Sequence, residues 1–170
     1  IIILDYESRL RHMRFFITGI LGQLGATIMR MLPTGTSSGR DLPDFDITGI
    51  EQVREAICAA EPDVVIHCAA FSDVDGCARD PEKAQLVNAT GTRNVATVCA
   101  EHGAAMVLLS TNEVFDGHSA KPYIETDEPA PINSYGQSKL HAEWHTRELL
   151  ERYYIVRTSW ICLLYTSAAA

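Results

Sequence analysis

The stretch that decides the fold is residues 15–25, which reads Phe-Phe-Ile-Thr-Gly-Ile-Leu-Gly-Gln-Leu-Gly. Its apolar start, Phe15 to Ile17, stops at the first of three glycines that are spaced three residues apart. A short apolar run that ends at a turn predicts a buried strand. The residues from Gly22 to Leu32 then predict a helix, which Pro33 closes. A glycine turn between a buried strand and a helix is typical of a nucleotide phosphate site.

Each glycine of this turn has a separate physical task. Gly19 permits the tight turn, and Gly22 lets the backbone approach a pyrophosphate that a side chain would push away. Gly25 allows the helix to pack closely on the strand. The free N–H groups and the dipole at the start of the helix then attract the phosphates. We expect cofactor contacts from Gly19, Leu21, Gly22, Gln23, Leu24 and Gly25.

Strand and helix patterns alternate along the rest of the chain. Helices are predicted over 50–60, 81–102 and 134–151, and strands over 63–67, 105–109 and 153–156. Such alternation predicts an α/β protein with a doubly wound parallel sheet of the Rossmann type. Residues 34–44 have little apolar content. The strand expected there is therefore either very short or has lost residues.

Composition bounds the class of protein. The chain has 170 residues, 46% of them apolar and 21% charged, with a net charge of −8. This balance argues against nucleic-acid binding, and no apolar run is long enough to span a membrane. The five cysteines include no C-x-x-C pair and no zinc-ligand spacing, which favours a reducing, cytoplasmic setting without a metal.

The two ends depart from the pattern of the interior. Residues 1–12 precede Met13 and are predicted to be a non-native or disordered extension, with a genuine N-terminal extension as the alternative. Residues 162–170 begin with Cys-Leu-Leu-Tyr-Thr-Ser, which resembles a translated sequencing adapter. We therefore expect a Rossmann domain over 13–161, an artefactual tail over 162–170, and a substrate domain that is largely absent.

Residues 135–139 form a Tyr-x-x-x-Lys unit. If Ser134 caps the helix, Tyr135 and Lys139 lie one turn apart on the same face. Lys139 is then expected to lower the pKa of the phenol, which could protonate a carbonyl oxygen as hydride arrives. Thr111 follows a predicted strand at the edge where ligands bind, and its hydroxyl could hold the same oxygen.

The adenosine side of the cofactor is less determined. An acidic residue about 20 positions beyond the glycine turn usually binds the ribose, and Asp41, Asp44 and Asp46 are all in range. Arg40 either accepts a 2′-phosphate or is a solvated loop charge. The choice between NADH and NADPH therefore stays open.

Taken together, several segments resemble the extended short-chain dehydrogenase/reductases, and within them the dTDP-4-dehydrorhamnose reductases. They occur in the order found in that family and span nearly all of 13–161. The segments are TGILGQLG at 18–25, FDIT at 45–48, PDVVIHCAAFSDVD at 62–75, VNATGTRNV at 87–95, STNEVFDG at 110–117, INSYGQSK at 132–139 and RTSW at 157–160.

The resemblance implies NADPH- or NADH-dependent reduction of the 4-keto group of a dTDP-linked 6-deoxyhexose. Tyr135 would be the acid, and Lys139 would adjust the pKa of its phenol and contact the ribose. Thr111 would bind the carbonyl oxygen through its hydroxyl. Further cofactor contacts would come from Arg40, Asp46, Ile47, Cys68, Ala69, Ala70 and Asn88. Substrate contacts would come from Ser110, Asn112, Glu113 and Trp160. The implied partner is a nucleotide sugar, with no nucleic acid and no membrane, and a homodimer is compatible with the family.

The chain also departs from the family. Asn112 and Glu113 stand where the family usually has Asp-Tyr, and Ala78 replaces a frequent Glu. Two alternatives therefore stay open. One is another sugar-nucleotide enzyme, an epimerase or dehydratase that recycles a tightly held NAD. The other is a non-catalytic protein like the regulatory β-subunit of methionine adenosyltransferase.

Overall fold

A parallel β-sheet organises the chain in the computed structural model, which describes residue 10 and residues 12–159. The strands lie side by side in the order β2-β1-β3-β4-β5, and each neighbouring pair is parallel. The predicted α/β class is confirmed. The strands are β1 (Phe15–Thr18), β2 (Ser37–Arg40), β3 (Val64–His67), β4 (Ala105–Thr111) and β5 (Tyr153–Thr158).

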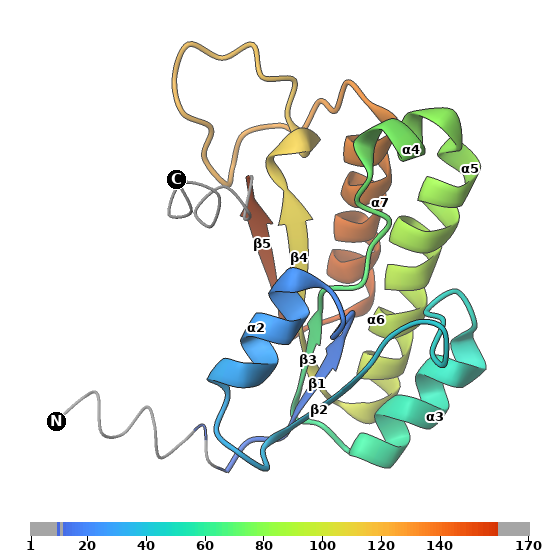
Figure 1. Cartoon of the computed structure of the whole chain (residues 1–170). Helices are drawn as coiled ribbons and strands as arrows, with labels where there is room; N and C mark the ends of the chain where they lie inside the picture. Colours follow the sequence, from blue (N-terminus) through green and yellow to red (C-terminus); the bar gives the residue numbers. More distant parts are fainter. Residues whose placement is uncertain (1–9, 11, 160–170) are drawn as a thin grey trace, which may run out of the picture.

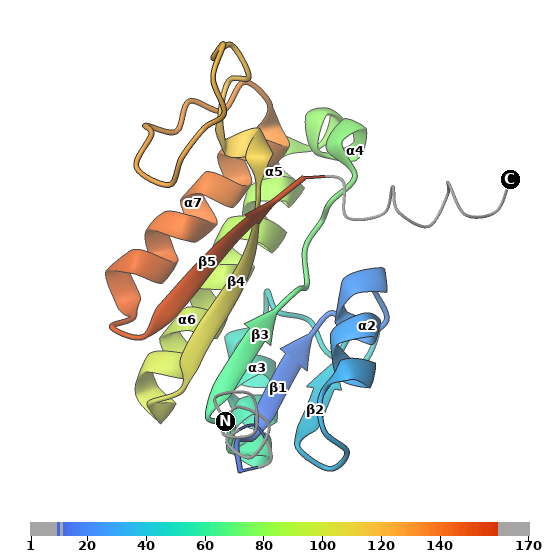
Figure 2. The ribbon, with the colours of Figure 1, turned by 90° about the vertical axis from the view of Figure 1, so that its left-hand side faces the viewer.

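Helices cover both faces of this sheet, as a doubly wound fold requires. Helix α2 lies on one face, and α3, α6 and α7 lie on the other (Figures 1 and 2). The helical segments are α2 (Gln23–Met31), α3 (Ile50–Ala60), α4 (Val74–Arg79), α5 (Pro81–Ala84), the π-helical η1 (Gln85–Thr90), α6 (Gly91–His102), the 3₁₀ turn η2 (Asn112–Val114) and α7 (Ser134–Leu149).

The main hydrophobic core lies between the sheet and the face formed by α3, α6 and α7. Val53 and Ile57 of α3 are fully buried there, beside Met106 and Leu108 of β4. Ala56 and Ala60 are partly buried and pack against the same cluster. The predicted apolar face of the second helix is therefore confirmed.

The weak stretch after the first helix does contain a strand, and it is very short. Strand β2 has four residues and pairs in register with β1, from Phe15 opposite Ser37 to Thr18 opposite Arg40. It is an edge strand whose residues are at most half-buried, so it needs little apolar content. The first of the two alternatives for this stretch is the correct one.

Three local details differ from the sequence-based expectations. The long helix predicted over 81–102 is interrupted by the π-helical turn η1, and α4 was not predicted. Ser134 is the first residue of α7 and does not cap it. Asn133 caps the helix instead, because its side-chain oxygen accepts the Gly136 N–H at 2.7 Å.

The predictions for the two ends concern residues that are mostly outside the described part. Of the predicted extension, only residues 10 and 12 are described, and the predicted tail at 162–170 and Trp160 are not. Within the described part, no helix combines the length and apolar character that crossing a bilayer would demand.

Candidate active site

A cavity of about 920 Å³ opens at the carboxyl ends of the strands. This is where open α/β sheets bind their ligands, and the volume is at the upper end of the ~300–1,000 Å³ found for ligand sites. Most of the predicted site residues line it. They are Gly19, Gly22, Gln23, Leu24, Gly25, Asp46, Ile47, Cys68, Ala69, Ala70, Ser110, Thr111, Asn112, Glu113, Tyr135 and Lys139.

The glycine turn forms one wall of this cavity. Gly19 has a φ of +77°, which favours glycine, and a Cβ there would lie 2.7 Å from the Ala69 nitrogen. A Cβ on Gly25 would collide with the Gly19 carbonyl oxygen. Gly22 precedes α2 and has no side chain that could cap it, so the positive end of the helix dipole faces the cavity. This wall can therefore hold an anionic group.

A buried hydrogen-bond chain holds the neighbouring backbone in place. Thr92 Oγ1 donates to the Asn88 carbonyl at 2.6 Å, so it accepts from His67 Nε2 at 3.1 Å. His67 Nδ1 is then unprotonated and accepts from the Thr18 hydroxyl at 2.6 Å, while Thr18 Oγ1 accepts the Ala69 N–H at 3.2 Å. Burial lowers the pKa of His67 to about 3, with Lys139 adding to the effect, so the ring is neutral. The chain fixes the cavity wall at Ala69.

Asn88 supports the cavity from behind and does not line it. Its side-chain oxygen accepts the Phe71 N–H at 2.8 Å, and its side-chain nitrogen donates to the Phe71 carbonyl at 3.0 Å. The same nitrogen donates to Ser138 Oγ at 2.9 Å. Asn88 lies in η1, so the π-helical turn joins the loop after β3 to α7. Asn88 was predicted to contact the cofactor, but it is not among the residues that line the cavity.

Two of the three candidate acids, Asp41 and Asp46, line the cavity. Asp41 lines the cavity, and its Oδ2 accepts the Leu21 N–H of the glycine turn at 2.8 Å. The Oδ1 of Asp41 accepts the Leu42 N–H at 2.8 Å, and the Oδ1 of Asp46 accepts from Thr48 N–H at 2.9 Å and Thr48 Oγ1 at 2.8 Å. The side chain of Leu21 is 74% exposed, and Arg40 is exposed at the end of β2. Neither Leu21 nor Arg40 lines the cavity.

The three residues that the sequence predicts to be catalytic also line this cavity. Thr111 at the end of β4 and Tyr135 in the first turn of α7 both line the cavity, with their hydroxyls near enough to interact. Lys139, one helical turn beyond Tyr135, is 3% exposed. Burial lowers the pKa of Lys139 to about 8, against the opposing effects of Glu143 and Cys68. The sequence prediction that the pKa of Tyr135 is lowered is wrong: burial raises it, and the Thr111 hydrogen bond offsets this only in part.

Some predicted substrate contacts are engaged elsewhere. The Ser110 hydroxyl donates to Glu143 Oε1 at 2.6 Å, so it is turned toward the protein interior. Glu113 accepts from the side chain of Asn133, the cap of α7, at 2.8 Å. Asn112 is exposed and lines the cavity. Trp160 lies outside the described residues, so its predicted contact is not placed.

Sequence reasoning missed two charged residues of this region. Lys83 of α5 lines the cavity, and its ammonium lies 4.8 Å from the centre of the Phe71 ring. Glu143 is fully buried on α7. The signal for Glu143 was available, because it stands four residues after Lys139 and therefore on the same face of the predicted helix.

The parallel sheet, the glycine turn and the cavity at the strand ends define a Rossmann-type nucleotide-binding domain. Comparison with known proteins agrees and is more specific. The chain belongs to the family described as RmlD substrate binding domain, whose family model matches residues 13–167. The resemblance to the dTDP-4-dehydrorhamnose reductases is thereby confirmed.

Individual relatives support this membership. The dTDP-4-dehydrorhamnose reductase of Escherichia coli K12 is 36% identical over 154 residues, which cover 88% of this chain and 52% of that protein. A probable low-salt glycan biosynthesis reductase of Haloferax volcanii is 38% identical over 158 residues, which cover 86% of this chain and 53% of that protein. The chain spans about half the length of the curated relatives it matches.

A solved structure shows the same arrangement. The dTDP-4-dehydrorhamnose reductase of Bacillus anthracis, crystallised in complex with NADP, superimposes with a TM-score of 0.84 at 41% identity. The match covers 87% of this chain and 53% of that chain. The fold described above is therefore the fold of the corresponding half of that protein.

Proposed function

We propose that this chain forms the cofactor-binding and proton-donating part of an NAD(P)H-dependent reductase. The proposed reaction reduces the 4-keto group of a dTDP-linked 6-deoxyhexose, as in dTDP-L-rhamnose biosynthesis. One observation carries the proposal. The paired hydroxyls of Thr111 and Tyr135, with Lys139 one turn away, line the same cavity as the glycine turn. Donors for an anionic dinucleotide and a proton source for a carbonyl thus face one space.

The residues present fit a dinucleotide. Backbone forms much of the wall at Gly19, Gly22 and Ala69, where close approach to a pyrophosphate needs the absence of side chains. The start of α2 adds a favourable dipole. The carboxylate of Asp41 stands beside the glycine turn, at the position where an acid binds the adenosine ribose in such folds.

The chain's own residues then account for proton transfer. When bound, a reduced nicotinamide would supply the hydride to the carbonyl carbon. The raised pKa of Tyr135 keeps its phenol protonated at neutral pH, as a proton donor must be. Thr111 can hydrogen-bond the carbonyl oxygen, and Lys139, which lines the same cavity, would contact the ribose of a bound cofactor, as the family resemblance implies.

The substrate, the assembly and the compartment remain part of the proposal. The two relatives whose names specify a sugar nucleotide or a glycan support a nucleotide-sugar substrate. We also propose a cytoplasmic location, because the four cysteines in the described part of the chain are free thiols. A homodimer stays a prediction from the family resemblance.

The proposal is tested by following the absorbance of the reduced cofactor in the presence of a dTDP-4-keto-6-deoxysugar. The assay uses the 170-residue chain and the longest reading frame that contains it. We expect cofactor oxidation by the longer protein, and a loss of about 10²–10⁴-fold in Tyr135→Phe. Equal rates of cofactor oxidation for the longer protein and its Tyr135→Phe variant would exclude Tyr135 from the mechanism.

The same assay separates the alternatives. A purified protein with bound NAD and no net cofactor consumption would favour an epimerase or dehydratase. Cofactor binding without turnover of any tested ketosugar, together with recovery of a synthetase in a pull-down, would favour a regulatory subunit.

A further inference from the structure

Helix α7 carries a row of ionisable side chains that begins in the active site and ends at the surface. Tyr135, Lys139, Glu143 and Arg147 follow one another at intervals of four residues, so neighbours in the row lie one turn apart. Lys139 and Glu143 are both buried, and Glu143 has no exposed surface. A buried carboxylate directly behind a buried active-site ammonium needs an explanation.

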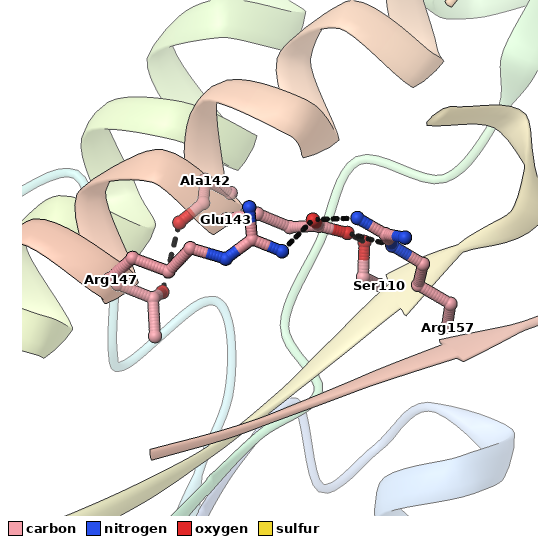
Figure 3. A network of polar contacts seen from close by, with 6 residues as sticks. Ser110, Ala142, Glu143, Arg147 and Arg157 are labelled. Carbon is pink, nitrogen blue, oxygen red and sulfur yellow. Dashed lines mark hydrogen bonds and ion pairs between the residues drawn. The ribbon is translucent and has the colours of Figure 1, made fainter. Parts of the chain in front are cut away.

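The carboxylate of Glu143 is held by four hydrogen bonds from three residues (Figure 3). Its Oε1 accepts from Ser110 Oγ at 2.6 Å and from Arg157 Nε at 2.9 Å. Its Oε2 accepts from Arg157 at 2.7 Å and from Arg147 at 3.2 Å. These donors occupy about all the acceptor sites of a carboxylate, and two of the three donor residues are arginines.

These bonds also fix where α7 lies. Ser110 and Arg157 belong to β4 and β5, so the network ties the middle of the helix to the two strands. Ser110 is the residue before Thr111, whose hydroxyl meets that of Tyr135. The network therefore sets the helix against the strand at the place where the two hydroxyls converge.

The surroundings of Lys139 contain few other charges. The groups that interact with its ammonium are Glu143 on the same helix, and Cys68 and His67 at the end of β3. His67 is neutral, and burial raises the pKa of the Cys68 thiol to about 11, so neither carries a charge at neutral pH. Glu143 is thus the one carboxyl group among them.

We propose that Glu143 is a positioning residue that acts through Lys139: its buried carboxylate, one helical turn away and fixed by Ser110 and Arg157, favours the charged form of the ammonium. A catalytic benefit of this arrangement rests on the proposed function. The effect of Glu143 on the charge of Lys139 does not. With a pKa of about 8, Lys139 is largely protonated at neutral pH, whereas a further fall of one unit would leave it about half charged.

A purely structural role for Glu143 predicts the opposite result. If the carboxylate only ties α7 to the sheet, its loss would loosen the helix and expose Lys139 to water. Exposure would raise the pKa of Lys139 from about 8 toward the ordinary lysine value of 10.5. If Glu143 acts through its charge, its loss lowers the pKa below 8. The direction of the shift decides between the two.

The test is an NMR titration of the 170-residue chain with 13C-labelled lysine, following the Cε signals from pH 5 to 11. The chain has three lysines, Lys83, Lys121 and Lys139, so the signals can be assigned by substitution. In Glu143→Gln we expect the pKa of Lys139 to fall by about one unit or more. An unchanged or raised pKa in a folded variant overturns the proposal.

Two further variants keep the test decisive. If Glu143→Gln does not fold, the double variant Glu143→Gln, Arg157→Gln removes the buried pair together and leaves no unpaired guanidinium. A fall in the pKa of Lys139 is expected there too, smaller than in the single variant because the positive charge of Arg157 is removed as well, and a raised pKa overturns the proposal. Glu143→Asp keeps the charge and should restore a pKa of about 8.

The matched control is Arg147→Gln. Arg147 belongs to the same network, but its side chain is 41% exposed and its charge is screened by water. We expect the pKa of Lys139 to stay within about half a unit of its original value in this variant. A fall as large as that in Glu143→Gln would show that any disturbance of the network has the effect, and would overturn the specific role of Glu143.

Discussion

Two buried basic side chains, close to the same cavity, differ in charge at neutral pH although burial lowers the pKa of both. His67 at the end of β3 is surrounded by the hydroxyls of Thr18 and Thr92, and its pKa falls to about 3. Lys139 on α7 is equally buried, but a carboxylate stands one turn away, and its pKa falls only to about 8. At neutral pH the first is therefore neutral and the second is charged.

The difference has two causes: a lysine starts from a pKa of 10.5 and a histidine from 6.5, and the partners of the two groups differ. Hydroxyls can satisfy a neutral imidazole completely, since one accepts from its N–H and the other donates to its free nitrogen. An ammonium needs a counter-charge to stay ionised away from water. The His67 region thus fixes the backbone at Ala69, and the Lys139 region keeps a charge at the cavity.

The largest effect expected from this comparison is a gain in stability in Lys139→Met. The folded-state pKa of Lys139 is below its unfolded value, so burying its charge costs free energy at all pH values below about 8. Removing the charge should raise the free energy of unfolding at pH 7 by up to ~3 kcal/mol, while the reductase chemistry is lost. Urea denaturation measures the gain.

The pH dependence provides a second check on Lys139. Between pH 8 and 10.5 the unfolded chain binds the extra proton, so the stability of the original protein should rise with pH. In Lys139→Met this rise should be smaller. Lys83→Met, which removes an exposed lysine, should leave it unchanged. Equal stability of the two methionine variants at pH 7 would contradict the assigned cost.

The next effect concerns acid and His67. Its pKa is lowered in the folded state, so the unfolded chain takes up the proton first as the pH falls below 6.5. Stability should therefore decrease between pH 7 and pH 5, by ~2 kcal/mol from this group. The control His118→Gln, at an exposed position, should keep the decrease. A His67→Gln variant with the same decrease would show that other groups cause it.

A smaller effect is expected when one hydroxyl is removed from the His67 chain. Thr18→Val leaves His67 Nδ1 and the Ala69 N–H without their partner, which should cost ~1–2 kcal/mol and weaken dinucleotide binding. Thr18→Ser keeps the hydroxyl and should keep binding. Calorimetric titration with NADH measures the loss. If the serine variant binds as weakly as the valine variant, the methyl group and not the hydrogen bond is what matters.

The smallest expected effect concerns Asp41, a partly exposed acid, and the choice between NADH and NADPH. The carboxylate of Asp41 beside the glycine turn should repel a 2′-phosphate, so we expect the chain to bind NADH in preference to NADPH. Asp41→Asn should reduce this preference by about tenfold. Asp44→Asn, an exposed acid of the same loop, should not change it. A chain that binds NADPH more tightly, with no change in Asp41→Asn, would exclude this role.

Much of the site was predictable because it depends on local sequence. The glycine spacing, the buried strands and the Tyr-x-x-x-Lys unit each act over a few residues, and the structure brings them to one cavity. The cap of α7 was misplaced by one residue, since Asn133 and Ser134 are both good caps and only the backbone decides between them. For strand β2 the sequence left two possibilities open, a very short strand or lost residues, because an edge strand has little apolar pattern.

The sequence by itself determined the fold class, the glycine turn and the candidate residues for the chemistry, because periodicity and residue spacing are local properties. Only the tertiary structure decided the protonation states. Glu143 meets Ser110 and Arg157 across 33 and 14 residues of chain, and His67 meets Thr18 and Thr92 across 49 and 25. The charge of a buried group depends on such distant partners and on the exclusion of water, and both exist only after the chain has folded.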